Sequence, residues 1–323
     1  MNTTSSERRQ ILQIGRQLPI LEQWLRERYT VFLLDEQEDP KAFFAQHGPN
    51  IVGVATSALF GVSAEQIAAL PALQIISCFG VGVDKIPLDV ARARGIRVGN
   101  TPDILNDCVA DTAFALLLDI ARATPEADRF VRAGLWAERG QNSFHLGRKV
   151  SGAKLGIVGL GRIGKTIARR ALGFEMDIRY HTRNPVADAP WAHESSLAAL
   201  AEWADFLIVI TAGGPGTKHL INADVLKALG PRSYLINVSR GSVVDEKALV
   251  KALQEKQIAG AALDVFENEP LVPNELLTMD NVVLLPHIAS ATEETRLAMA
   301  QRVIDNLDLF FAEGRLITAV ACD

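Results

Sequence analysis

The sequence has few cysteines, and they are not arranged to hold a disulfide framework or a metal ion. Its three cysteines, Cys78, Cys108 and Cys322, are an odd number and include no CxxC pair. We therefore expect neither a disulfide-stabilised secreted domain nor a zinc site, and we predict no metal. A reducing cytoplasm is the compartment that this cysteine usage indicates.

Long apolar runs and blocks of like charge are also missing. No run approaches the roughly 20 apolar residues of a transmembrane helix, and the polar start MNTTSSERRQ has no apolar segment of a secretory signal peptide. The formal net charge is −5, from 33 basic and 38 acidic residues, which gives no sign of a polyanion-binding face. We expect neither a membrane nor a nucleic acid as a partner.

The sequence does have the length and the apolar content for two domains. Its 323 residues are 48% hydrophobic, which is enough for a sizeable core and favours two domains over one. Short β-rich runs alternate with helical runs, a pattern typical of α/β proteins with a parallel sheet covered by helices. The predicted strands cover residues 11–14, 31–34, 51–57, 73–79 and 96–100, and then, after one that begins at residue 154, residues 177–182, 206–211, 233–238, 260–265 and 282–286.

Two helical features accompany these strands. Ser63 and Gln66 have the spacing of a capping box at the start of a helix. A long apolar-rich helix is predicted over 109–126, between the two series of strands.

A glycine-rich turn follows the strand that begins at residue 154. Gly159, Gly161 and Gly164 are in GxGxxG register between a strand and a helix. In a dinucleotide site the first glycine permits the tight turn, the second lets the pyrophosphate approach, and the third lets helix and strand pack closely. The amides of Arg162 and Ile163 at the helix start are then expected to face the phosphates. The alternative is an ordinary turn between a strand and a helix.

Polar residues follow three successive predicted strands of the second series. Arg240, Asp264 with Glu269, and His287 each come shortly after a strand. Ligands of open parallel sheets bind beyond the carboxyl ends of the strands, so these side chains are candidates for chemistry. Singly, each has a structural alternative, namely a loop ion pair, a solvated turn residue or a satisfied core histidine; together they indicate a site.

The residues at the end of the strand 177–182 concern the choice of cofactor. His181 lies 22 positions after Gly159, close to the separation of about 20 at which an acid binds the ribose hydroxyl of NAD. Here His181, Thr182 and Arg183 offer no carboxylate, and a guanidinium would attract a 2′-phosphate. We predict a preference for NADPH over NADH. The alternative is that Arg183 lies on the surface in a turn before a proline.

In combination and in this order, several motifs resemble the D-isomer-specific 2-hydroxyacid dehydrogenases over nearly the whole chain. They are GVGVD at 80–84, VADTAFALLL from 109, GLGRIG, NVSRG, LDVFENEP and PHIAS. The resemblance is strongest to glyoxylate and hydroxypyruvate reductases and to hydroxyphenylpyruvate reductases. It implies two doubly wound parallel-sheet domains: a flavodoxin-like substrate domain at 1–100 and 288–323, and a Rossmann dinucleotide-binding domain at 101–287.

The resemblance also implies roles for the clustered side chains. Arg240 would hold the carbonyl oxygen and carboxylate of a 2-keto acid, and His287 would protonate the alkoxide as it forms. Glu269 would orient the His287 ring and favour its charged form. Backbone amides at Val81 and Gly82 would bind the substrate carboxylate.

Further family roles are implied for residues near the cofactor and at a subunit contact. Asp264 would position the nicotinamide amide or shape the site, and Thr112 would contact the nicotinamide. The apolar helix from Val109 to Ala123 would form part of a homodimer contact, unless it is simply buried. Trp136 resembles an aromatic residue near the substrate or the dimer contact; an ordinary core tryptophan is the alternative.

The expected activity is NADPH-dependent reduction of glyoxylate or hydroxypyruvate to the D-2-hydroxy acid, with NADH as a second cofactor. Hydroxyphenylpyruvate and 2-ketogluconate are alternative substrates within the family. Formate dehydrogenases resemble the family but carry a glutamine where Glu269 stands, so the acid favours hydroxyacid chemistry. A non-catalytic dinucleotide-sensing protein of the same fold is the alternative from another functional class.

Overall fold

The computed structural model describes residues 8–321, so Cys322 lies outside the described part of the chain. The chain divides into two compact units. Unit 1 consists of residues 1–105 and 292–323, and unit 2 of residues 106–291. Within residues 8–321, no helix is both long enough and apolar enough to cross a membrane.

The boundaries of the units lie a few residues beyond those expected from the sequence, at 105/106 and 291/292 in place of 100/101 and 287/288. Local hydrogen bonds explain the difference. The N–H of Thr101 donates to the carbonyl of Gly80 at 2.9 Å, which keeps this segment in unit 1. The N–H groups of Ile288 and Ala289 donate to Asp264, which keeps the other segment in unit 2.

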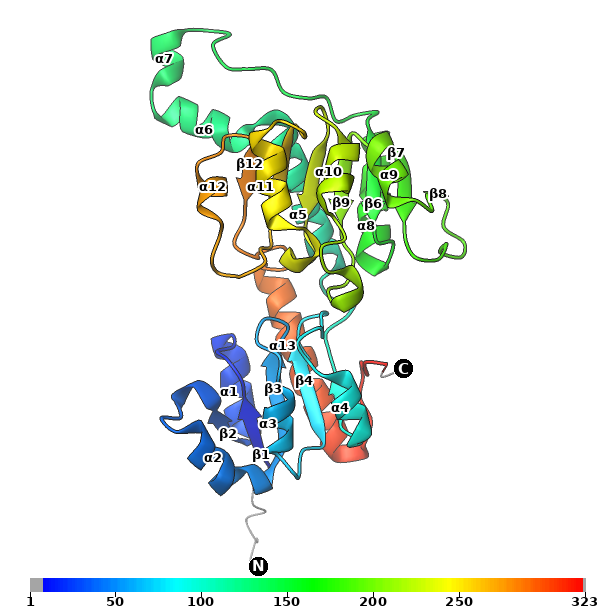
Figure 1. Ribbon diagram of the computed structural model, residues 1–323. Coiled ribbons are helices and arrows are strands. Elements are labelled where there is room, and N and C mark those ends of the chain that lie inside the picture. The colour runs from blue at the N-terminus through cyan, green and yellow to red at the C-terminus, as the bar shows by residue number, and fades with distance from the viewer. Residues whose placement is uncertain (1–7, 322–323) are drawn as a thin grey trace, which may run out of the picture. The chain divides into compact units, whose positions relative to one another are not determined.

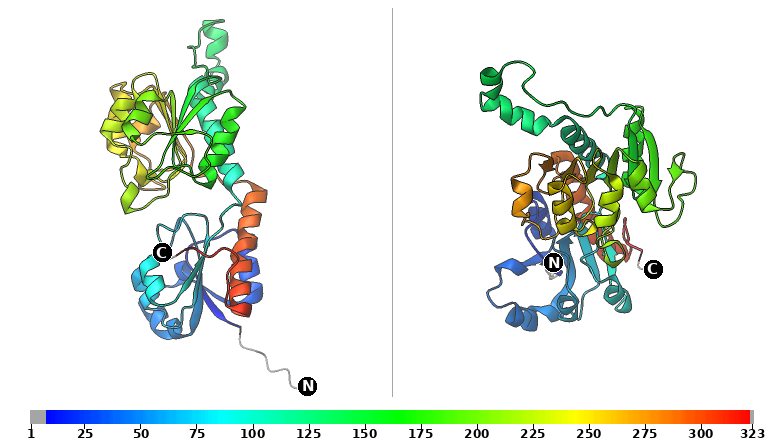
Figure 2. Two further views of the ribbon diagram at one scale, coloured as in Figure 1. Left: turned by 90° about the vertical axis from the view of Figure 1, so that its right-hand side faces the viewer. Right: turned by 45° about the horizontal axis from the view of Figure 1, so that its top comes forward.

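Unit 1 contains a five-stranded parallel sheet in the order β2-β1-β3-β4-β5. This is the strand order of flavodoxin-like domains. Helices α1 and α13 contact each other on one face of the sheet, and α3 and α4 contact each other on the opposite face (Figures 1 and 2). The elements are β1 (Gln10–Gln13), α1 (Pro19–Arg28), β2 (Thr30–Leu33), α2 (Pro40–His47), β3 (Ile51–Ser57), α3 (Ala64–Ala68), β4 (Ile75–Phe79), α4 (Leu88–Ala93), β5 (Arg97–Gly99) and α13 (Glu293–Glu313).

The predicted capping box at the start of α3 is confirmed. The hydroxyl of Ser63 accepts from the N–H of Gln66 at 3.1 Å, and the Gln66 side chain accepts from the N–H of Ser63 at 2.8 Å. Two backbone donors that the first helical turn leaves without a partner are thereby satisfied.

Unit 2 contains a seven-stranded parallel sheet in the order β12-β11-β10-β9-β6-β7-β8. The chain order reverses between β6 and β9, which is the switch point where open α/β sheets bind their ligands. Both units are doubly wound parallel sheets, so the predicted fold class is confirmed. The strands are β6 (Lys154–Val158), β7 (Asp177–His181), β8 (Ala192–His193), β9 (Phe206–Val209), β10 (Tyr234–Asn237), β11 (Gly260–Leu263) and β12 (Val282–Leu284).

Helices cover both faces of this sheet (Figure 2). Helices α5 and α8 pack together on one face, and α10 contacts both α9 and α11 on the other. Eight residues of α5 are buried, and α5 contacts β10 and β11 of its own unit. The helices are α5 (Asn106–Arg122), α6 (Thr124–Arg132), α7 (Leu135–Arg139), α8 (Arg162–Leu172), α9 (Leu197–Trp203), α10 (Ala223–Leu229), α11 (Glu246–Gln254) and α12 (Asn274–Leu277).

The long helix predicted over 109–126 is wrong in extent. It ends at Arg122, and Ala123 adopts a left-handed conformation with φ 50° before α6 begins. Pro125 has no N–H to donate to the carbonyl of Ala121, which accepts instead from the N–H of Arg148 at 2.7 Å. Helices α6 and α7 then extend away from the sheet of unit 2 as an arm (Figure 1).

Candidate active site

The turn after β6 depends on two of its glycines for its own shape. Gly159 has φ +104°, and a Cβ at this position would lie 2.9 Å from the carbonyl oxygen of Ile210. A Cβ at Gly164 would lie 2.1 Å from the carbonyl oxygen of Gly159. Both positions therefore require glycine for the strand, turn and helix to pack.

Gly161 differs from the other two glycines because, among residues 8–321 and apart from its chain neighbours, no atom lies within 4 Å of the place of a Cβ. It directly precedes α8, and no side chain caps the start of this helix. The first amides of a helix carry a partial positive charge and bind phosphate groups. The open space at Gly161, directly before the first turn of α8, fits the diphosphate of a dinucleotide.

The end of β7 lies beside this glycine turn, because the carbonyl of His181 accepts from the N–H of Gly159 at 2.9 Å. Nδ1 of His181 is 2.8 Å from the carbonyl oxygen of Glu194, and the Thr182 hydroxyl donates to the carbonyl of Asn184 at 2.6 Å. Within residues 8–321, the exposed guanidinium of Arg183 has no ion-pair or hydrogen-bond partner. Of the three residues predicted here, Arg183 is the one whose side chain is not engaged by the protein.

Arg240 lies in a turn built by buried polar groups after β10. The Asn237 side chain accepts from the N–H and from the hydroxyl of Ser239, at 3.1 and 2.7 Å. Its amide donates to the carbonyl of Arg240 at 3.1 Å. The guanidinium of Arg240 in turn donates to the carbonyl of Ser239 at 2.8 Å. Sequence reasoning missed Asn237; the available signal was a buried amide at the end of an apolar strand.

The Arg240 turn packs directly against the loop that follows β11. A Cβ at Gly241 would lie 1.8 Å from the carbonyl carbon of Phe266, so this backbone approach requires glycine. Within that loop, Oε1 of Glu269 accepts from the N–H of Phe266 at 3.0 Å. The positions of the guanidinium and of the carboxylate are thus coupled through one backbone contact.

Glu269 and His287 form an ion pair between the loops after two neighbouring strands, β11 and β12. Oε2 of Glu269 is 2.7 Å from Nδ1 of His287, and both side chains are less than half exposed. Burial alone would raise the pKa of Glu269. The hydrogen bond and charge of His287, the N–H of Phe266 and the charge of Arg240 outweigh this effect and hold the pKa below its ordinary value.

Asp264 is 1% exposed and fixes the backbone that carries His287. Its two oxygens accept from the N–H groups of Ile288 and Ala289 at 2.7 and 2.9 Å, and its carbonyl accepts from the N–H of His287 at 2.8 Å. His287 has φ 56°, an uncommon conformation for a residue with a side chain. Burial raises the pKa of Asp264, although the two amides and His287 act in the opposite direction.

Thr112, on α5, lies next to this segment. Its hydroxyl is 3.2 Å from the carbonyl oxygen of Cys108 and 3.3 Å from that of Ala289. The structure thus brings Thr112 to the segment that Asp264 holds.

A second acid network supports the loop after β11. The side chain of the buried Glu246 accepts from the N–H of Glu267 at 2.7 Å, and Glu267 pairs with Nε2 of His219. Burial raises the pKa of Glu246, with Glu267 and Glu269 adding to the shift. Sequence reasoning missed Glu246, because an acid at the start of a helix is ordinary.

Val81 and Gly82 lie in unit 1, in the loop after β4. The carbonyl of Val81 accepts from the side chain of Asn100 at 2.8 Å. In the described part of the chain, the N–H groups of Val81 and Gly82 have no acceptor. Two adjacent backbone donors of this kind are suited to a carboxylate.

Taken together, unit 2 presents a guanidinium, an imidazole paired with a carboxylate, and a glycine turn with room for a diphosphate, all on the strand ends of one sheet. These groups can stabilise a developing oxyanion and deliver a proton to it. The family model described as "D-isomer specific 2-hydroxyacid dehydrogenase, NAD binding domain" matches residues 114–289. The chain belongs to this family. The resemblance found in the sequence is thereby confirmed.

Individual members of the D-isomer specific 2-hydroxyacid dehydrogenase family match almost the whole chain. Hydroxyphenylpyruvate reductase of Plectranthus scutellarioides is 44% identical over 93% of this chain and 95% of its own. The 2-ketogluconate reductase of Gluconobacter oxydans is 42% identical over 98% of this chain and 99% of its own. An NADPH-dependent glyoxylate/hydroxypyruvate reductase of Sinorhizobium meliloti, solved with NADP and malonate, is 45% identical with a TM-score of 0.91, over 98% and 97% of the two chains.

The arm of unit 2 carries apolar side chains that this dehydrogenase exposes. Trp136 on α7 is 53% exposed, so the alternative of a core tryptophan is wrong. Val131 on α6 is 53% exposed, and Leu146, in the segment that returns from the arm, is 96% exposed.

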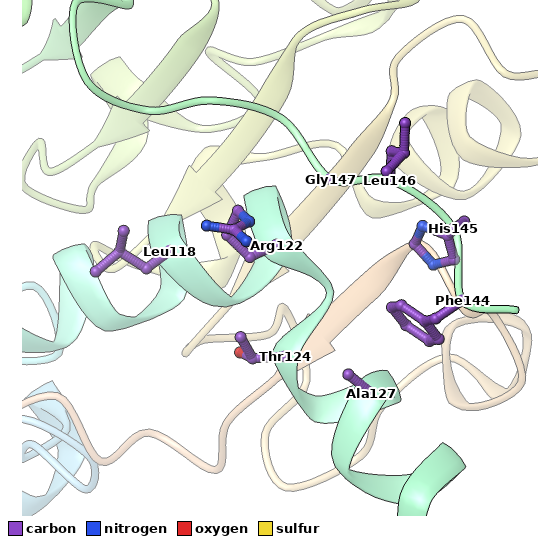
Figure 3. A pocket seen from close by; sticks show the side chains of 8 residues that line it. All are labelled: Leu118, Arg122, Thr124, Ala127, Phe144, His145, Leu146 and Gly147. Atoms are coloured by element: carbon purple, nitrogen blue, oxygen red, sulfur yellow. The ribbon is translucent and has the colours of Figure 1, made fainter. Parts of the chain in front are cut away.

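Near the base of the arm, a cavity of about 560 Å³ lies between the end of α5, α6 and the returning segment (Figure 3). His145 at this cavity pairs with Glu126 at 2.9 Å. No residue of the glycine turn or of the Glu269–His287 pair lines this cavity. Among residues 8–321, no cluster of three or more histidine, cysteine or acidic side chains is suited to a metal ion.

Proposed function

We propose that this dehydrogenase reduces a short 2-keto acid to the D-2-hydroxy acid, with glyoxylate and hydroxypyruvate as the leading substrates. NADPH is the preferred cofactor in this proposal, and NADH is the second. The observation that carries the proposal is the Glu269–His287 pair at 2.7 Å, held beside the Arg240 turn. The proposal is supported by the similarity of this chain to glyoxylate/hydroxypyruvate reductases of Arabidopsis thaliana and Sinorhizobium meliloti.

The proposed chemistry divides between the cofactor and the chain. When bound at the glycine turn, a nicotinamide cofactor supplies the hydride that reduces the keto carbon. Negative charge then develops on the carbonyl oxygen, and Arg240 stabilises it with a guanidinium that also holds the substrate carboxylate. The backbone amides of Val81 and Gly82 bind the same carboxylate.

His287 is the proposed acid of the reduction. Because its Nδ1 faces Glu269, its Nε2–H is the group that donates a proton to the substrate oxygen. The carboxylate of Glu269 fixes the ring orientation and favours the protonated imidazole. Oxidation of the hydroxy acid requires the neutral ring, so the two directions have opposite pH preferences.

Asp264 and Thr112 are proposed to shape the nicotinamide end of the site. Both carboxylate oxygens of Asp264 already accept backbone amides. Its role in this proposal is therefore to hold the segment of His287 to Ala289 in the geometry that the cofactor meets. The Thr112 hydroxyl, 3.3 Å from the carbonyl of Ala289, contacts the nicotinamide from α5.

Arg183 is proposed to bind the 2′-phosphate of NADPH. The guanidinium is exposed beside the glycine turn, has no partner among residues 8–321, and has no carboxylate next to it at 181 or 182. An ionised phosphate accepts two hydrogen bonds from one guanidinium. A ribose hydroxyl of NADH offers a much weaker interaction with it.

A homodimer formed through the arm is proposed as the quaternary structure. The buried face of α5 packs within its own unit, so the apolar helix 109–123 no longer argues for a dimer. The exposed Val131, Trp136 and Leu146 support a dimer, because they place several exposed apolar side chains on one protruding segment, which favours an interaction site. A reducing cytoplasm is the proposed compartment, because the three cysteines of the sequence are an odd number without a CxxC pair.

Steady-state kinetics test the activity. The purified chain is assayed with glyoxylate, hydroxypyruvate, hydroxyphenylpyruvate, pyruvate and 2-ketogluconate, each with NADPH and NADH. We expect the highest kcat/KM with glyoxylate or hydroxypyruvate and NADPH. Faster turnover of 2-ketogluconate or hydroxyphenylpyruvate would assign one of those substrates instead. Cofactor binding without turnover of any acid would replace the enzyme with a dinucleotide-sensing protein.

A further inference from the structure

We propose that His193 is a positioning residue for the choice of cofactor, because its ring fixes the loop that presents Arg183 to the 2′-phosphate of NADPH. This inference rests on the proposed function and extends it to a residue that does not touch the cofactor.

The ring of His193 holds the first residue of the loop. Its Nε2 is 3.0 Å from the carbonyl oxygen of Thr182. A carbonyl only accepts hydrogen bonds, so Nε2 must carry the hydrogen in either charge state of the ring. The Thr182 carbonyl directly precedes the N–H of Arg183, and this bond therefore sets the direction in which the loop leaves β7.

The other end of the loop, at Val186, is held by Tyr180 on β7. The N–H of Val186 donates to the phenol oxygen of Tyr180 at 3.0 Å, and Tyr180 is 2% exposed. The Thr182 hydroxyl donates to the carbonyl of Asn184 across the loop at 2.6 Å. Residues 182–186 are thus closed by three hydrogen bonds, with Arg183 exposed between them.

The two-residue strand β8 explains how His193 reaches this position. β8 pairs with β7 so that His193 is opposite Tyr180. The rings of Tyr180 and His193 are 5.1 Å apart, and those of His181 and His193 are nearly parallel at 6.4 Å. Neither residue of β8 is buried, since Ala192 is exposed and His193 is half-buried. The strand carries the ring that holds Thr182.

A fixed loop matters more for NADPH than for NADH. Binding the phosphate requires the guanidinium at a defined place, and ordering a mobile loop at that moment would lower the affinity. NADH has no phosphate to be met by Arg183. Loss of the His193 hydrogen bond should therefore weaken the binding of NADPH more than the binding of NADH. The chemical step should stay unchanged.

Three histidine variants test this inference together with R183A. H193F keeps an aromatic ring beside Tyr180 but removes the N–H, and H193Q restores a donor of similar reach. H145F is the matched control, because His145 also pairs through Nε2, with Glu126 near the arm. For the loss of one neutral hydrogen bond we expect H193F to raise the KM for NADPH by about 3- to 10-fold. We expect kcat and the KM for NADH to stay within about twofold of the wild-type values, because H193F removes no contact with NADH. H193Q should recover most of the loss, and H145F should behave as the wild type.

Calorimetry with adenosine 2′,5′-bisphosphate and with 5′-AMP measures the phosphate contribution without turnover. The inference is supported if H193F weakens the binding of the bisphosphate and leaves the binding of 5′-AMP unchanged. It is overturned if R183A abolishes the preference for the bisphosphate while H193F and H193Q keep that preference. It is also overturned if H193F weakens the binding of both nucleotides equally. If the wild-type protein turns over substrate but binds both nucleotides with equal affinity, the NADPH preference itself is refuted. The proposed role of His193 in that preference is then refuted as well.

Discussion

Oε2 of Glu269 lies 2.7 Å from Nδ1 of His287, and this contact joins the loops after two adjacent strands of the unit 2 sheet. The pKa of Glu269 lies below its ordinary value, so its carboxylate is ionised at neutral pH. In the proposed reaction this negative charge faces the ring that gives the proton.

Glu269→Gln removes that charge and keeps an acceptor for His287. The protonated ring is then less favoured, so the pH at which the reduction rate falls to half should move to lower pH, and the rise of the oxidation rate should move with it. Rates from about pH 5 to 9 measure both limbs. E267Q is the control, since Glu267 lies in the same loop but pairs with His219. An unchanged profile in E269Q would remove Glu269 from its role.

Glu246→Gln should stabilise the protein at neutral pH. Burial raises the pKa of Glu246, so the ionised side chain destabilises the folded state. This loss of stability is complete above the raised pKa and disappears below the ordinary value of 4.5, where the side chain is neutral in both states. The glutamine oxygen can still accept from the N–H of Glu267. Thermal melts should show a higher Tm for E246Q near pH 7 and no gain near pH 4. A lower Tm at both would contradict the argument.

Asp264→Ala should damage both stability and catalysis. It leaves the N–H groups of Ile288 and Ala289 without acceptors, and each buried unpaired amide costs about 1 to 3 kcal/mol. It also releases the backbone at His287, whose φ of 56° this contact supports. Urea unfolding and kcat measure the two effects. D264N, which keeps one acceptor, should lose less of both; equal stability of D264A and the wild type would rule out the backbone role.

Gly161→Ala and Gly164→Ala should separate cofactor binding from folding. In the described part of the chain, a Cβ at Gly161 meets no atom within 4 Å other than those of its chain neighbours, whereas one at Gly164 would lie 2.1 Å from a carbonyl oxygen. We expect G161A to keep the wild-type Tm but to bind NADPH at least about 10-fold more weakly, because the methyl group occupies the place of the pyrophosphate. G164A should lower the Tm. If a folded G161A binds NADPH with normal affinity, the pyrophosphate does not bind at this turn.

Arg183→Ala should raise the KM for NADPH far more than the KM for NADH. The loss of a hydrogen bond to a charged group is worth about 1.5 to 3 kcal/mol, or roughly 10- to 100-fold. R179A is a suitable control, because Arg179 is on the same strand but lies over the ring of Trp203, 4.3 Å from its centroid. Equal sensitivity of the two cofactors in R183A would show that this residue does not read the phosphate.

Local patterns in the sequence were sufficient for much of the fold. The alternation of short apolar runs located every strand of both sheets except β8, which has only two residues, too few for a period of two to be seen. The GxGxxG spacing predicts the turn after β6, because Gly159 and Gly164 each lack room for a Cβ while Gly161 leaves open space. The helix break at Ala123 was not foreseen, since the carbonyl released by Pro125 finds its partner 27 positions later at Arg148 (148 − 121).

The candidate site shows the same division. The order of residues along the chain shows which side chains follow the strand ends, and parallel strands bring those ends to one edge, so the sequence predicts Arg240, Glu269 and His287. How these side chains are held depends on the three-dimensional packing. The close approach at Gly241, the Asp264 bonds to Ile288 and Ala289, and the His193 bond to Thr182 join residues whose distance along the chain carries no signal, because such contacts depend on how separate loops pack.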